Sequence, residues 1–93
     1  MTREDRALEM RNRALDIVKA CVASPTKPEM REYTISGMTI KYDLLGDTRL
    51  LTVGTKAGKV LSIEWENSGK FRVLSYIPGL WETRLRHLTQ RRT

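Results

Sequence analysis

The chain has 93 residues, 40% of them hydrophobic, which suffices for one small folded domain over residues 1–93 and excludes a two-domain enzyme. One cysteine and one histidine exclude a disulfide framework and a four-ligand zinc site, so we expect neither a metal nor a cofactor. Seventeen Lys and Arg against eleven Asp and Glu give a net charge of +6, which favours polyanions over basic proteins as partners.

No apolar stretch approaches the roughly 18 residues that a membrane-spanning helix needs. The first six residues are mostly charged or polar and do not open an apolar run of the secretory type. We therefore expect a cytoplasmic protein without membrane contact, in which Cys21 is a free thiol.

An amphipathic helix is predicted between Glu4 and Val22, with Thr2 and Asp5 able to cap its start. Its stripe is made of apolar residues at helical spacing: Leu8, Leu15, Val18 and Val22, widened by Ala7, Ala14, Ile17 and Cys21. Arg11 lies inside this apolar arc, where a charge costs several kcal/mol unless it is paired or reaches water. Three alternatives stay open for Arg11: a path to solvent, a carboxylate partner, or a phosphate of a ligand.

A proline-containing linker is predicted at 24–29. Beyond it, apolar residues recur every two residues instead of every 3.6 residues, which is the spacing of a strand and not of a helix. This change predicts four to five strands between Tyr33 and Ile77. The turns at 56–58 and 67–69 are too short for parallel crossovers, so the sheet is predicted to be an antiparallel meander. Apolar residues on both sides of the last strand predict a central or doubly covered position for that strand.

Pro78 and Gly79 end the last strand, and a second helix is predicted over 80–91 with an apolar stripe of Trp81, Leu85 and Leu88. The predicted fold class is therefore α+β, with an N-terminal helix, an antiparallel meander of four to five strands and a C-terminal helix packed on one sheet face.

The positive charge is concentrated in the C-terminal quarter of the chain, which carries six basic residues and one acidic one. Arg84, His87 and Arg91 follow at i, i+3 and i+7 beside the apolar stripe of the second helix, and Lys70 and Arg72 begin the strand before it. Guanidinium groups bind phosphate bidentately, and an imidazole can move a proton near neutral pH. The alternative is that these charges only solubilise a terminal helix and complement its dipole.

Trp65 and Trp81 also have two interpretations. Both fit the apolar face of their elements, which places them in the core. The alternative is a surface on which nucleobases stack, where aromatic side chains are often interleaved with positive charge.

Three segments follow each other as strand, turn, strand, turn and strand before a basic helix: Arg49-Leu-Leu-Thr-Val-Gly54, Ala57-Gly-Lys-Val-Leu61 and Lys70-Phe-Arg-Val-Leu-Ser75. Over residues 47–88 the chain resembles the RelE superfamily of messenger-RNA-cleaving toxins, its BrnT-like branch in particular. The resemblance implies RNA cleavage by attack of a 2′-hydroxyl on the adjacent phosphate. It implies that the phosphate is held by Arg49, Arg72 and Arg84. It also implies that His87 or Tyr76 transfers the protons.

The candidate residues fall into two sets: His87, Arg72 and Arg84 for catalysis, and Arg49, Lys70, Arg72, Arg84 and Arg91 for nucleic-acid binding. We expect a small basic domain that associates with nucleic acid, RNA before DNA, and leave open whether it is an enzyme. The alternative is an interaction module or inhibitor, of the phage or mobile-element type, that binds an acidic surface of a partner protein without catalysis. Met10, Ile17 and Cys21 on the first helix could supply an apolar patch for a partner or for a homodimer.

Overall fold

The computed structural model describes residues 2–22 and 31–90, and the predicted linker at 24–29 and the candidate Arg91 lie outside the described residues. The elements in chain order are α1 (Arg3–Val22), β1 (Glu32–Ile35), β2 (Met38–Leu45), β3 (Thr48–Thr55), β4 (Gly58–Glu66), β5 (Phe71–Tyr76) and α2 (Leu80–Thr89).

The helix α1 begins as the sequence predicts. The backbone N–H of Asp5 donates to Thr2 Oγ1 at 3.1 Å, and the backbone N–H of Thr2 donates to Asp5 Oδ2 at 3.3 Å. Each side chain thus caps the backbone of the other, which satisfies donors that the first helical turn leaves open.

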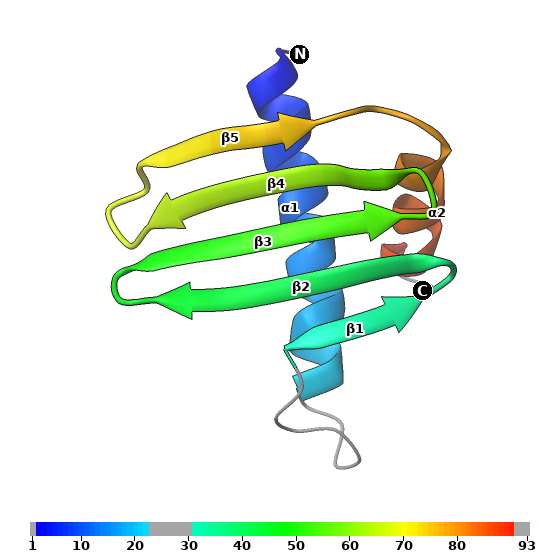
Figure 1. Ribbon diagram of the computed structural model, residues 1–93, viewed down its shortest axis with the longest axis horizontal. Helices are drawn as coiled ribbons and strands as arrows, with labels where there is room; N and C mark the ends of the chain where they lie inside the picture. Colours follow the sequence, from blue (N-terminus) through cyan, green and yellow to red (C-terminus); the bar gives the residue numbers. More distant parts are fainter. Residues whose placement is uncertain (1, 23–30, 91–93) are drawn as a thin grey trace.

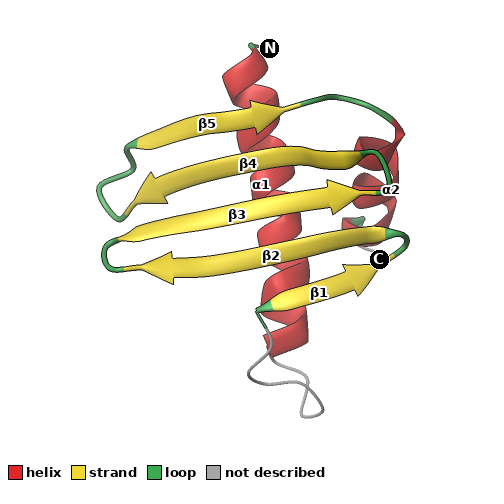
Figure 2. Ribbon diagram, in the orientation of Figure 1, coloured by secondary structure: helices red, strands yellow, loops and turns green. Residues whose placement is uncertain are grey.

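The five strands form one antiparallel sheet in the order β1-β2-β3-β4-β5, so every neighbour in the sheet is also a neighbour in the chain (Figure 2). The β1–β2 turn consists of Ser36 and Gly37, which both have positive φ angles, as a two-residue hairpin turn with right-handed strand twist requires. The predicted meander is confirmed, with five strands.

The prediction of a central last strand is wrong, because β5 lies at an edge of the sheet. Ser62 pairs with Ser75 but Ile63 pairs with Val73, so Leu74 is an extra residue at a bulge. The bulge changes which face the following side chains take, and Leu74 itself is 47% exposed. The apolar residues on both sides of this strand therefore reflect a bulge and an exposed leucine rather than two covering layers.

Both helices lie on the same face of the sheet (Figure 1). The helix α1 crosses behind all five strands, and α2 packs beside α1 behind one end of the sheet, which is the right end in this view. The α+β prediction is confirmed, including a C-terminal helix on one sheet face. Neither of the two described helices is long and apolar enough to cross a membrane.

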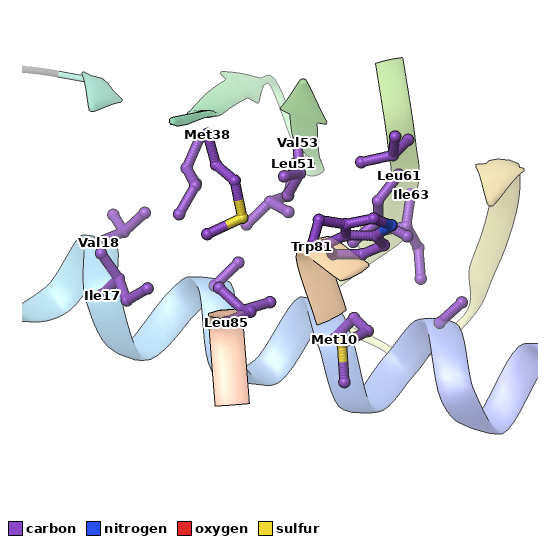
Figure 3. Close-up of a cluster of buried hydrophobic side chains, with 14 of the residues drawn as sticks. Met10, Ile17, Val18, Met38, Leu51, Val53, Leu61, Ile63, Trp81 and Leu85 are labelled. Atoms are coloured by element: carbon purple, nitrogen blue, oxygen red, sulfur yellow. The ribbon is translucent and has the colours of Figure 1, made fainter. Parts of the chain in front are cut away.

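The core fills the space between the helices and the sheet (Figure 3). Its fully buried large side chains come from both layers: Met10, Met38, Ile40, Leu51, Leu61, Ile63, Leu85 and Val53. Trp81 is 5% exposed, and its Nε1–H donates to the carbonyl oxygen of Ile77 at 2.7 Å, which satisfies the indole on burial. The core interpretation of Trp81 is therefore confirmed.

Candidate functional site

The sheet extends beyond α1 on the side away from α2, and neither described helix lies behind this end, which is the left end in Figure 1. Three side chains are brought together here by strand pairing: Arg49 lies opposite Trp65, and Trp65 lies opposite Phe71. Directly paired residues share a sheet face, and these three share the helix-facing side with Leu51 and Ile63. We call this region the Trp65 end.

A hollow of about 410 Å³ opens at the Trp65 end between α1 and the sheet. We call it the helix-side hollow; its lining residues are Leu8, Arg11, Arg49, Trp65, Glu66, Asn67, Gly69 and Phe71. Small-molecule sites commonly occupy roughly 300–1,000 Å³, so this space is large enough for a ligand of moderate size. Gly69 has a φ of +95°, a backbone conformation that favours glycine in the β4–β5 turn at the rim.

Arg11 reaches the hollow from α1 and lies on the indole of Trp65, with its Cζ 4.7 Å from the ring centroid. Its Nε and Nη2 donate to Asn12 Oδ1 at 3.2 and 2.8 Å. Burial lowers the pKa of the Arg11 guanidinium, and no acidic neighbour contributes an opposing shift. The structure therefore holds this cation by an aromatic face and a neutral amide.

Arg49 reaches the same hollow from β3 and is held in a similar way. Its Nη1 donates to the side-chain oxygen of Asn67, which is again a neutral amide. Among residues 2–22 and 31–90, the ion pairs of the structure involve neither Arg11 nor Arg49. The hollow thus carries two guanidinium charges without a paired carboxylate, while Glu66 lies at its rim.

A second hollow, of about 260 Å³, adjoins the first; we call it the open-face hollow, lined by Thr48, Glu64, Trp65, Glu66, Lys70, Phe71 and Arg72. Arg72 and Glu64 pair across the strands on the face of the sheet away from the helices, with 2.6 Å between Nη2 and Oε1. Trp65 and Phe71 line both hollows. The two hollows therefore adjoin at Trp65, Glu66 and Phe71, which line both of them.

The candidate nucleic-acid-binding residues are divided by the fold. Arg49, Lys70 and Arg72 all line the two hollows of the Trp65 end. Arg84 is exposed on α2, at the other end of the sheet, and its Nη1 lies near Gly37 in the β1–β2 turn. The structure therefore brings three of the five candidates together and places Arg84 elsewhere.

The candidate catalytic residues are not brought together. Arg84 and His87 are exposed on α2, on the covered side of the sheet, whereas Arg72 is on the open face. Tyr76 is buried, and its hydroxyl donates to Glu82 Oε2. Burial and, after it, the neighbouring Glu82 carboxylate raise the pKa of Tyr76 to about 12, which leaves it poorly suited to exchange protons near neutral pH.

Charges on the opposite side of α1 are paired with carboxylates, in a region we call the α2 flank. Arg6 Nη2 lies 3.2 Å from Oε1 of the buried Glu82, which also accepts the backbone N–H of Gly79 at 3.2 Å. Arg13 and Arg86 both pair with Glu9, each at 3.3 Å. The hydrogen bond from Arg86 is the main cause that lowers the pKa of Glu9.

The apolar patch predicted on the first helix is not a surface. Met10 is fully buried and Ile17 is 8% exposed, so both belong to the core, and Cys21 is a partly buried free thiol. The most exposed large apolar side chains near the β5–α2 connection are instead Ile77 and Leu80, at 57% and 80%.

Sequence reasoning missed the two amides that orient the guanidinium groups, Asn12 and Asn67, because an asparagine on a helix surface or in a turn carries no distinctive signal. It did single out Arg11, whose position inside the apolar arc was the usable signal. Phe71 was assigned only to a strand, although at 37% exposure it remains accessible at the rim.

Comparison of the chain with protein-family models, with curated proteins and with solved structures finds no match. Within the described part of the chain, no group of three or more His, Cys, Asp or Glu side chains could hold a metal ion. The function of the protein is therefore inferred from the geometry of the Trp65 end.

Proposed function

We propose that the protein binds single-stranded nucleic acid, with RNA as the first candidate, at the Trp65 end. The observation that carries this proposal is that Arg49 lines one hollow and Lys70 and Arg72 line the adjoining one, while Trp65 and Phe71 line both. These residues come from β3, β4, β5 and the turn before β5, so their proximity is a product of the fold.

Single-stranded nucleic acid is recognised by cationic side chains that follow its backbone and by aromatic side chains on which its bases stack. The Trp65 end offers both kinds of group around one edge of the sheet, with Arg49 at the helix-side hollow and Lys70 and Arg72 at the open-face hollow. The net charge of +6 attracts such a strand over a longer range than any one contact. A duplex fits this site less well, because its stacked bases cannot reach Phe71 without being unpaired.

The proposal is for binding without cleavage. A cleavage site of the kind that the RelE resemblance implies needs the phosphate-holding and proton-transferring groups around one phosphorus atom. Arg72 lies on the open face, Arg84 and His87 lie on α2, and the Tyr76 hydroxyl is occupied by Glu82. The resemblance to these toxins stays a prediction.

The test is fluorescence anisotropy with a labelled uridine oligomer of about 12 nucleotides, a length within the range that small single-strand binding folds occupy. Affinity is expected to fall as KCl rises from about 50 to 200 mM, with a log–log slope of roughly −0.7 for each phosphate neutralised. The double variant Lys70→Ala/Arg72→Ala should bind more weakly and show a flatter slope.

The matched control is Lys19→Ala/Arg84→Ala, which removes two exposed positive charges outside the Trp65 end. Equal losses in the two double variants would mean that net charge alone drives association and would refute the site. No binding of the oligomer at low salt would refute nucleic-acid association itself. The alternative of an inhibitor that binds a partner protein would then be the remaining prediction.

A further inference from the structure

The helix-side hollow differs from every other charged cluster described in the chain. Arg6, Arg13, Arg72 and Arg86 each have a carboxylate within 4 Å, whereas Arg11 and Arg49 are held by the side-chain oxygens of Asn12 and Asn67. An amide oxygen orients a guanidinium group without neutralising it. The two charges therefore remain available to an anion that enters the hollow.

Both guanidinium groups are also held in place before any ligand arrives. Arg11 is fixed on one side by the face of Trp65 and at Nε and Nη2 by Asn12, contacts that do not use its Nη1. Asn67 holds Arg49 through Nη1, a contact that leaves Nε and Nη2 unused. Ordered side chains lose less conformational entropy on binding, so this arrangement favours affinity for an anion that accepts several hydrogen bonds.

Phe71 supplies a different kind of contact in the same hollow. It is 37% exposed, whereas the partly buried Trp65 already contacts Arg11 and Tyr42, whose ring centroid is 6.1 Å from that of the indole at an interplanar angle of 23°. Of these three aromatic side chains, Phe71 is thus the most exposed and the most accessible to a nucleobase. Trp65 acts instead as a support for Arg11.

Building on the proposed function, we propose that the helix-side hollow binds one nucleotide of the strand, with its phosphate between Arg11 and Arg49 and its base against Phe71. Phosphate oxygens accept hydrogen bonds from two guanidinium forks at once. The hollow of about 410 Å³ has room for a nucleotide rather than for a bare anion alone. Glu66 at the rim opposes the phosphate and limits its affinity.

The experiment is an NMR titration of the full chain that follows the Nε–H signals of Arg11 and Arg49, using three probes: uridine 5′-monophosphate, uridine and inorganic phosphate. Uridine 5′-monophosphate is expected to shift both signals and to bind about tenfold more tightly than either of the other two probes. Equal affinity for inorganic phosphate would overturn the role of Phe71, and equal affinity for uridine would overturn the phosphate site.

Three single variants sharpen the assignment. Arg11→Gln should weaken binding of uridine 5′-monophosphate about tenfold, because one charged donor pair is lost. Glu66→Gln should strengthen it two- to threefold. Lys19→Gln removes an exposed charge from the same helix as Arg11 and should leave the affinity within twofold. An Arg11→Gln variant that binds as well as Lys19→Gln would overturn the phosphate site.

Failure of this site and failure of the proposed function give different results. In the first case, the affinity for the uridine oligomer falls on replacement of Lys70 and Arg72 but is the same for Arg11→Gln as for the unaltered protein. Nucleic-acid binding then stands, and the nucleotide site in the hollow is refuted. If uridine 5′-monophosphate shifts the Arg11 and Arg49 signals but the oligomer does not bind, the hollow is a site for a free nucleotide and strand binding is refuted.

Discussion

Arginine side chains on the two sides of α1 have different kinds of partner. On the α2 flank, Arg6 pairs with Glu82, and the hydrogen bond that Arg86 donates to the Glu9 carboxylate raises the pKa of Arg86. At the Trp65 end, Arg11 lies on an indole beside a neutral amide, and burial lowers its pKa.

The two regions differ in the group that contacts the guanidinium, which is a carboxylate on the α2 flank and a neutral amide for Arg11 and Arg49. A guanidinium group paired with a carboxylate offers a ligand less net charge than an unpaired one, and on the α2 flank such pairs join α1 to α2. One oriented by an amide keeps its charge, at a cost in desolvation that the fold does not recover. The paired arginines of the α2 flank therefore stabilise the packing of the two helices, whereas Arg11 and Arg49 at the Trp65 end are disposed for binding.

The largest effect is expected from the buried carboxylate of the α2 flank. Glu82→Ala leaves the Tyr76 hydroxyl, the Gly79 N–H and Arg6 without their common acceptor, and should lower the free energy of unfolding by about 3 kcal/mol. Urea unfolding followed by circular dichroism measures this loss. Glu66→Ala at the Trp65 end is the matched control and should change stability by less than about 0.5 kcal/mol. Similar losses in both variants would contradict the distinction between the two regions.

The second prediction uses alkaline pH. The pKa of Tyr76 is raised in the folded state from 10.0 to about 12, so the unfolded chain releases this proton first. The contribution of Tyr76 is therefore fully present below pH 10 and is lost as the pH rises to about 12, by about 2 kcal/mol. Tyr76→Phe should abolish this part of the alkaline loss, as measured by urea unfolding at a series of pH values. An unchanged alkaline slope in the variant would show that Tyr76 is not the group concerned.

The smallest effect is expected when one arginine on each side of α1 is replaced and the two losses of stability are compared. Arg6→Met should lower the free energy of unfolding by about 1 kcal/mol, because the partly exposed Arg6 stabilises a buried carboxylate. Arg11→Met should change it by less than about 0.5 kcal/mol, since the loss of a cation–π contact is offset by removal of a desolvated charge. Thermal unfolding of the two variants in parallel is the measurement. A larger loss for Arg11→Met than for Arg6→Met would reverse our assignment of the two regions.

Local patterns in the sequence were sufficient to predict the two helices and the antiparallel meander. Helical spacing, alternation and turn residues act within a few positions of the chain, so they can be recognised without the fold. The bulge at Leu74 was not recognised in this way, because the shift of apolar residues from one phase to the other looks the same in sequence as a strand covered on both faces.

Which charges are neutralised was decided by the tertiary structure alone. Arg6 and Glu82 are separated by 76 residues, and the hydrogen bond between them exists because α2 packs beside one side of α1 and not the other. Arg11 was identifiable from the sequence as a charge within an apolar arc, but its meeting with Arg49, Trp65 and Phe71 depends on where α1 crosses the sheet. Periodicity determines which face of an element a side chain occupies, whereas its partner is determined by the packing of elements that are distant in the chain.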